Sequence, residues 1–116
     1  MNIQLYLYKR SFDTQKAERF FKERRIVFQV FDLKKHKLGR RELELFARKA
    51  GACALLDREN ALVKSHPVMY TDDERIVLGY LLEHPEFLRT PLVRDGQRTM
   101  VGFDEKEYLA FIANQD

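Results

Sequence analysis

The sequence predicts an α/β fold in which helices flank a four-stranded mixed sheet, with a helical insertion between the second and third strands. Three observations support this class. Residues 3–31 read as strand, helix, strand; residues 41–85 have mainly helical periodicity; residues 91–101 hold an Asp-Gly pair between two strand-like runs. A strand-helix-strand opening implies a parallel strand pair, and a hairpin adds an antiparallel pair.

The opening unit is defined by a change of period. Apolar residues alternate over 3–8, which predicts a strand. Ala17, Phe20 and Phe21 then have the spacing of one buried helical stripe, and charged residues occupy the other faces. Residues 26–31 are β-branched and aromatic, which predicts the second strand.

The middle of the chain reads as helices. Residues 41–50 are amphipathic, and Gly51 stands where a glycine commonly ends a helix. The stretch 51–69 has little periodicity and predicts a short helix with loops. The segment Thr71–Glu74 resembles a capping box with Thr71 as the cap, and Pro85 is expected to end the helix that follows.

The last third predicts a hairpin and a closing helix. Asp95-Gly96 suits a tight turn between two strands. Asp104, with Glu107 three residues later, predicts the cap of a final helix whose buried residues include Tyr108.

Bulk properties exclude several classes of protein. The chain has 116 residues, so we expect one domain spanning 1–116. The net charge of +3 is too weak to imply nucleic acid. With no leader and no apolar run of membrane length, we expect a cytoplasmic monomer that binds no membrane. Cys53 is the single cysteine, and the histidines lie far apart, so neither a disulfide nor a metal site is expected: His36, His66 and His84.

This order of elements is that of a thioredoxin-like (glutaredoxin-like) fold, and four segments resemble the arsenate-reductase-like (ArsC/Spx/YffB) family. Ser11 falls on the reactive cysteine of that family, just before the Lys16-Ala17 pair of its first helix. The four segments, in chain order, are 9–17, 71–85, 88–93 and 101–104. The resemblance covers essentially the whole chain and implies a bacterial relative of thiol-dependent reductases.

The chain departs from this family at its chemistry. A serine hydroxyl at position 11 stays protonated near neutral pH and has no redox chemistry. Thr14 stands where Spx-type members carry a second cysteine, and Thr90 stands where reductases carry an arginine before the proline, with Arg89 one position earlier. We therefore expect a pseudoenzyme that shows no reductase turnover. The resemblance also implies a cis bond between Thr90 and Pro91.

The expected site is the loop at Ser11, where the residue also suits a helix N-cap. A small thiol or an oxyanion would bind there, with glutathione or another low-molecular-weight thiol as the candidate and no bound cofactor. Basic side chains could converge on this loop, including Arg98, or could be separate surface charges. The residues expected to contact the ligand are Lys9, Arg10, Phe12, Arg58, Arg89, Thr90 and Pro91.

Other interpretations stay open at this point. Cys53 is expected to be a buried, inert residue, with a resolving thiol as the alternative. Ser11 is either a natural residue or an engineered replacement for cysteine. The alternative function is that of an Spx-like regulatory protein, which would contact RNA polymerase through the region around Gly51 and the basic stretch 34–41. Nucleic acid is disfavoured because no aromatic residue alternates with those basic residues.

Overall fold

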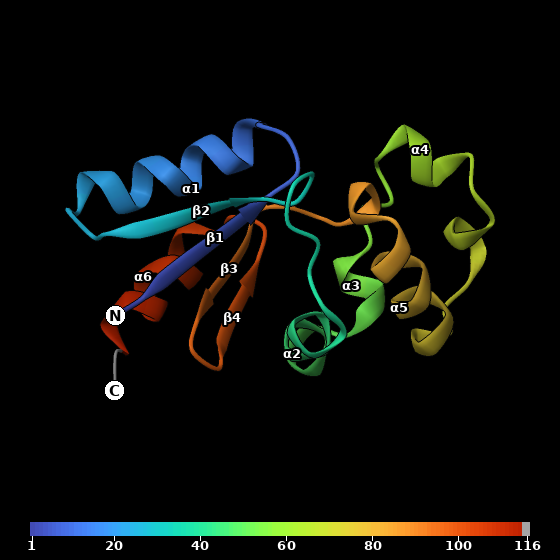
Figure 1. The fold of residues 1–116 in the computed structure, drawn as a ribbon. Coiled ribbons are helices and arrows are strands. Elements are labelled where there is room, and N and C mark those ends of the chain that lie inside the picture. The colour runs from blue at the N-terminus through green and yellow to red at the C-terminus, as the bar shows by residue number, and fades with distance from the viewer. Residues whose placement is uncertain (115–116) are drawn as a thin grey trace.

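The computed structural model describes residues 1–114. Four strands form one sheet in the order β2-β1-β3-β4 (Figure 1). Helices surround the sheet and fill the insertion between β2 and β3. The elements are β1 (Ile3–Leu7), α1 (Phe12–Glu23), β2 (Phe28–Asp32), α2 (Arg40–Ala50), α3 (Ala52–Leu55), α4 (Ala61–Lys64), η1 (Pro67–Tyr70), α5 (Glu74–Glu83), η2 (Pro85–Phe87), β3 (Leu92–Asp95), β4 (Arg98–Val101) and α6 (Glu105–Ala113).

The sheet is mixed, as the sequence predicts. β1 pairs in parallel with β2, with Leu5 opposite Val30. β1 also pairs antiparallel with β3, and β3 pairs antiparallel with β4. The predicted second strand was placed too early, since β2 begins at Phe28. Val27, just before it, is 84% exposed, so its β-branched side chain gains nothing from the core.

Two apolar clusters hold the fold together on either side of the sheet. The first packs α1 and α6 against the strands and contains the stripe residues Phe20 and Phe21 together with Tyr108. The hydroxyl of Tyr108 donates to the carbonyl of Gly102 at 2.6 Å, which satisfies a buried polar group. The second cluster joins the other side of the sheet to the helical lobe of α2, α3 and α5 and includes Phe46.

The cap of α5 differs from the prediction. The helix begins at Glu74, and its cap is Asp73, whose carboxylate accepts from the backbone of Arg75 and Ile76. Thr71 lies two residues earlier, where its hydroxyl accepts from the Asp73 backbone at 3.2 Å. Thr71 therefore shapes the turn before the helix. A carboxylate is the stronger acceptor for the helix terminus, where the backbone dipole favours negative charge.

The hairpin turn is also shifted by one residue. Asp95 pairs with Arg98 in the ladder, so the two loop residues are Gly96 and Gln97. Gly96 has φ +62°, a conformation that suits glycine. The predicted cap of α6 is confirmed, since the Asp104 carboxylate accepts from the backbone of the helix's first turn.

Within residues 1–114, no helix is both long enough and apolar enough to cross a membrane.

Candidate functional site

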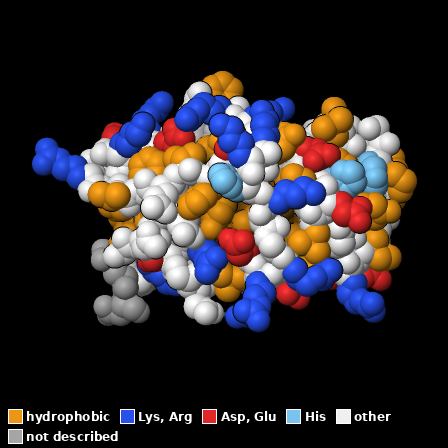
Figure 2. Space-filling view, viewed as in Figure 1, with side chains coloured by type: hydrophobic (Ala, Val, Ile, Leu, Met, Phe, Trp, Pro, Cys, Tyr) orange, Lys and Arg blue, Asp and Glu red, His pale blue; other side chains and the backbone are white. Residues whose placement is uncertain are grey.

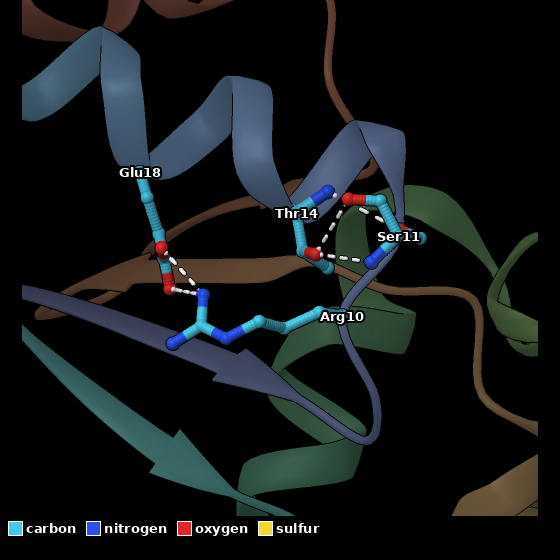
Figure 3. A network of polar contacts seen from close by, with 4 residues as sticks. All are labelled: Arg10, Ser11, Thr14 and Glu18. Atoms are coloured by element: carbon cyan, nitrogen blue, oxygen red, sulfur yellow. Dashed lines mark hydrogen bonds and ion pairs between the residues drawn. The ribbon is translucent and has the colours of Figure 1, made fainter.

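Ser11 begins α1 as its N-cap, as predicted. Its hydroxyl accepts from the Thr14 backbone at 3.3 Å, and the Thr14 hydroxyl accepts from the Ser11 backbone at 2.7 Å (Figure 3). The Thr14 hydroxyl also donates to the Ser11 carbonyl at 2.9 Å. Thr14 is fully buried, so this pair fixes where the chain leaves β1 and enters the helix. The free N–H groups of the first turn, at Phe12 and Asp13, are donors that such a terminus offers to an anion.

A cavity of about 580 Å³ lies beside this loop. Ser11 lines it together with Lys9, Arg58, Arg89 and Thr90. These residues come from the β1–α1 loop, the segment after α3 and the segment before β3. The fold therefore brings five of the nine predicted site residues to one cavity from three separate stretches of sequence.

The cavity carries both signs of charge. Within the described part of the chain, three cations line it, but four acidic residues line it too: Asp13, Asp57, Glu59 and Glu86. Sequence reasoning missed all four, because they lie on different segments and only the fold brings them together. The mixed lining disfavours a simple oxyanion with two negative charges, since the acidic groups repel it. It suits a ligand that carries an ammonium as well as carboxylates.

Arg10 is turned away from the expected position. One guanidinium nitrogen, Nη1, lies 2.7 and 2.6 Å from the two carboxylate oxygens of Glu18, one turn further along α1 than Thr14 (Figure 3). The Glu18 side chain is only 11% exposed, whereas that of Arg10 is 59% exposed. Arg10 therefore neutralises a nearly buried acid and is not among the cavity-lining residues.

Phe12, Pro91 and the buried Thr14 also lie outside the cavity lining, as does Arg98, which was considered as a further basic side chain. Phe12 points into solvent, with 82% of its surface exposed. Pro91 is buried, and its bond with Thr90 is cis. Arg98 binds the Asp95 carboxylate at 2.8 Å and lines a different cavity near α6.

Arg58 and Arg89 differ in how many contacts their guanidinium groups make with other protein groups. Arg58 donates to the carbonyls of Met69 and Thr71 and lies 3.6 Å from a carboxylate oxygen of Asp72. Arg89 is exposed, and its guanidinium lies against Gly102. No ion pair within residues 1–114 involves Arg89, so its charge is available to a ligand.

Cys53 lines the same cavity as Ser11 and is only partly buried, which corrects the expectation of a buried thiol. Burial raises the pKa of the thiol, and a hydrogen bond with Glu74 raises it further. The Glu74 carboxylate also accepts from the Cys53 backbone at 2.7 Å. These contacts hold Cys53 as a protonated thiol at neutral pH, which is the poorly reactive form.

The chemistry open to Ser11 follows from its neighbours. A serine nucleophile needs a base within hydrogen-bond reach. Within residues 1–114, no histidine lines the cavity, and the Ser11 hydroxyl is bonded to a backbone N–H. This arrangement favours a binding cleft over hydrolysis.

The sheet order, the parallel β1–β2 pair and the helix that begins at Ser11 beside the cavity define a thioredoxin-fold protein of the arsenate-reductase-like class. The chain belongs to the ArsC family, whose family model matches residues 6–111. A search of curated proteins found no significant match.

Solved structures with the same fold support this assignment. A YffB protein superimposes with a TM-score of 0.83 at 24% identity, covering 93% of this chain and 96% of that one. An ArsC-related protein from Brucella melitensis gives 0.73 at 24% identity, covering 97% and 95%. An arsenate reductase from Vibrio cholerae gives 0.81 at 16% identity, covering 95% and 97%. At sequence identities of 24% or less, these matches show that the chains share a fold.

Proposed function

We propose that this ArsC-family protein binds a zwitterionic low-molecular-weight thiol, of which glutathione is the type, in the Ser11 cavity without carrying out thiol exchange. The observation that carries the proposal is the mixed charge of the lining, with three cations and four acids around one helix terminus. Glutathione has two carboxylates and one ammonium, so it can pair with both signs at once. The cavity volume falls in the range of small-molecule sites.

The exposed guanidinium of Arg89 supports a carboxylate contact, because a guanidinium binds a carboxylate through two parallel hydrogen bonds. The Ser11 side chain replaces the nucleophile, so a bound thiol meets a hydroxyl with which it forms no covalent bond. Thr14 stands at the position of the second cysteine in Spx-type members. Its hydroxyl is already hydrogen-bonded to the Ser11 backbone in the helix cap. The interaction with RNA polymerase stays a prediction from the resemblance.

Titration calorimetry with reduced glutathione tests this function. We expect saturable binding that Arg89→Ala weakens by about tenfold, which corresponds to the loss of one charge-assisted contact. Arg98→Ala is the matched control, since Arg98 lines a different cavity, and it should leave the affinity unchanged.

Inorganic phosphate and arsenate serve as competing probes. Tighter binding of either one than of glutathione would assign the cavity to simple oxyanions. Absence of any binding at millimolar glutathione would remove the proposal.

A further inference from the structure

We propose that the outer edge of β4 binds an extended acidic segment of a partner protein as an added strand. β4 ends the sheet, because it pairs with β3 on one side only. Among the residues that the structure describes, the groove beside it shares no lining residue with the Ser11 cavity. The proposed interaction therefore stands apart from thiol binding.

The backbone of β4 offers unused pairing groups. The carbonyl of Thr99 accepts from the side-chain nitrogen of Lys49 at 3.0 Å, so it points away from β3. In an antiparallel pair, alternate residues face the partner strand, so the backbone of Val101 points outward as well. The backbone N–H of Gly102 donates to Pro91 at 2.8 Å, toward β3, which agrees with this alternation. Such groups form the template for an added strand.

A groove of about 420 Å³ runs beside this edge. Leu45 of α2 lines one side, and Ala110 of α6 lines the other. Phe111 is only 7% exposed, so it supplies an apolar floor and no projecting ring. Apolar side chains of a bound strand would lie on this floor while its backbone pairs with Thr99 and Val101.

The charge of the groove indicates the composition of its occupant. Arg48, Lys49 and Arg98 line it, and Glu107 is the single acid that lines it among residues 1–114. Arg98 is already bound to Asp95 at 2.8 Å and stacks over the Phe111 ring at 4.1 Å. The other two cations belong to α2. In Figure 2, Lys and Arg side chains lie at the lower edge of the molecule, where Figure 1 draws α2, with Asp and Glu side chains among them.

Lys49 binds the edge of β4 at the point where an added strand would pair. Its ammonium occupies the Thr99 carbonyl that a strand would use. When a strand displaces it, the ammonium is free to pair with a carboxylate of that strand. Arg48 is exposed on the same turn of α2 and adds a second cation. An acidic strand therefore gains backbone pairing and two ion pairs together.

A protein segment fits better than single-stranded nucleic acid. Proteins that bind single-stranded nucleic acid combine a basic groove with exposed aromatic side chains on which bases stack. Among residues 1–114, Phe111 is the one aromatic residue that lines the groove, and it is buried. Glu107 would also repel a continuous phosphate backbone, whereas a peptide can place an apolar residue or a backbone N–H beside it.

The test is an NMR titration of the ¹⁵N-labelled protein with the blocked peptide acetyl-Glu-Val-Glu-Val-Glu-Val-amide. We expect the largest amide shifts at Thr99 and Val101, with β2, the other sheet edge, unaffected. The double variant Arg48→Glu/Lys49→Glu should weaken binding by at least about tenfold, since two attractive pairs become repulsive. The matched control is Arg19→Glu/Lys22→Glu on exposed positions of α1, which makes the same charge change and should bind as the wild type does.

Circular dichroism checks that both double variants are folded. If Arg48→Glu/Lys49→Glu is not folded, Lys49→Gln replaces it. The proposal is overturned if no shift appears at millimolar peptide, or if the shifts fall mainly on β2. Equal affinity for the Lys-Val counterpart of the peptide would also overturn it. A further contrary result would be that a ten-nucleotide oligothymidine shifts the amide signals of the groove residues while the acidic peptide does not.

Discussion

The side chain of Arg89 lies across Gly102, with its Nη2 atom 3.3 Å from the position that a β-carbon would take on that glycine. Gly102 also has φ +77°, in the left-handed region that other residues rarely adopt. The bare glycine therefore leaves room for the one cavity arginine that has no ion-pair partner within residues 1–114.

Gly102→Ala should therefore lower the free energy of unfolding by about 1–2 kcal/mol, the cost of a left-handed conformation for an L-residue. It should also weaken glutathione binding, because the new methyl group displaces the Arg89 guanidinium. Urea unfolding and calorimetry measure the two effects.

The matched control is Gly79→Ala in α5, where no atom lies within 4 Å of the new methyl group. That change should stabilise the protein by roughly 0.5–1 kcal/mol through helix propensity. Equal stability changes in the two variants would contradict this account of Gly102.

The Arg10–Glu18 pair gives a second prediction. Arg10→Ala leaves the nearly buried Glu18 carboxylate without its partner, so the free energy of unfolding should fall. Because the arginine is mostly exposed, we expect a loss of only about 1 kcal/mol. The loss should shrink at high salt. Arg19→Ala, an exposed neighbour on the same helix, should have little effect. If Arg10→Ala weakens glutathione binding without changing stability, Arg10 belongs to the binding site after all.

The thiol of Cys53 gives a pH-dependent prediction. Burial and the bond with Glu74 raise its pKa, so the thiolate forms only at more alkaline pH and alkylation should be slow at neutral pH. The midpoint of the rate against pH should lie above the ordinary value of about 8.5. Glu74→Gln keeps an oxygen acceptor but removes the charge, so it should lower the midpoint. Because Cys53 is the only cysteine, the rate reports it alone. A midpoint below the ordinary value would show that the thiol is activated, and a midpoint that Glu74→Gln leaves unchanged would show that Glu74 does not raise the pKa.

Local patterns predicted the fold well where one segment decides its own structure. The stripe of Phe20 and Phe21 and the cap at Asp104 needed only neighbouring residues, and both predictions are confirmed. Thr71 and Asp73 illustrate the limit of such patterns. Both can cap a helix, and the sequence does not show which side chain meets the free N–H groups.

The candidate site was predicted less completely, because its electrostatics depend on the fold. The position of Ser11 followed from the strand-loop-helix pattern, and the cap confirms its structural role. The partner of Arg10 lies eight residues away and cannot be read from a charge count. Asp57 reaches the cavity from the segment after α3 and Glu86 from η2, so the sequence suggested an anion site where the structure places mixed charge.

The account rests on Ser11 holding the place of a thiol at a helix terminus that still supports an anion. Three features favour a thiolate there in Ser11→Cys: the free N–H groups, the helix dipole and the Lys9 charge. Asp13 opposes them, whereas Phe12 is too exposed to desolvate the site.

The most direct measurement is the pH dependence of alkylation of Ser11→Cys in a Cys53→Ala background. The account predicts a thiol pKa below the unperturbed value of about 8.5, together with formation of a mixed disulfide when oxidised glutathione is added and one glutathione is released. A pKa at or above that value, with no mixed disulfide, would contradict it.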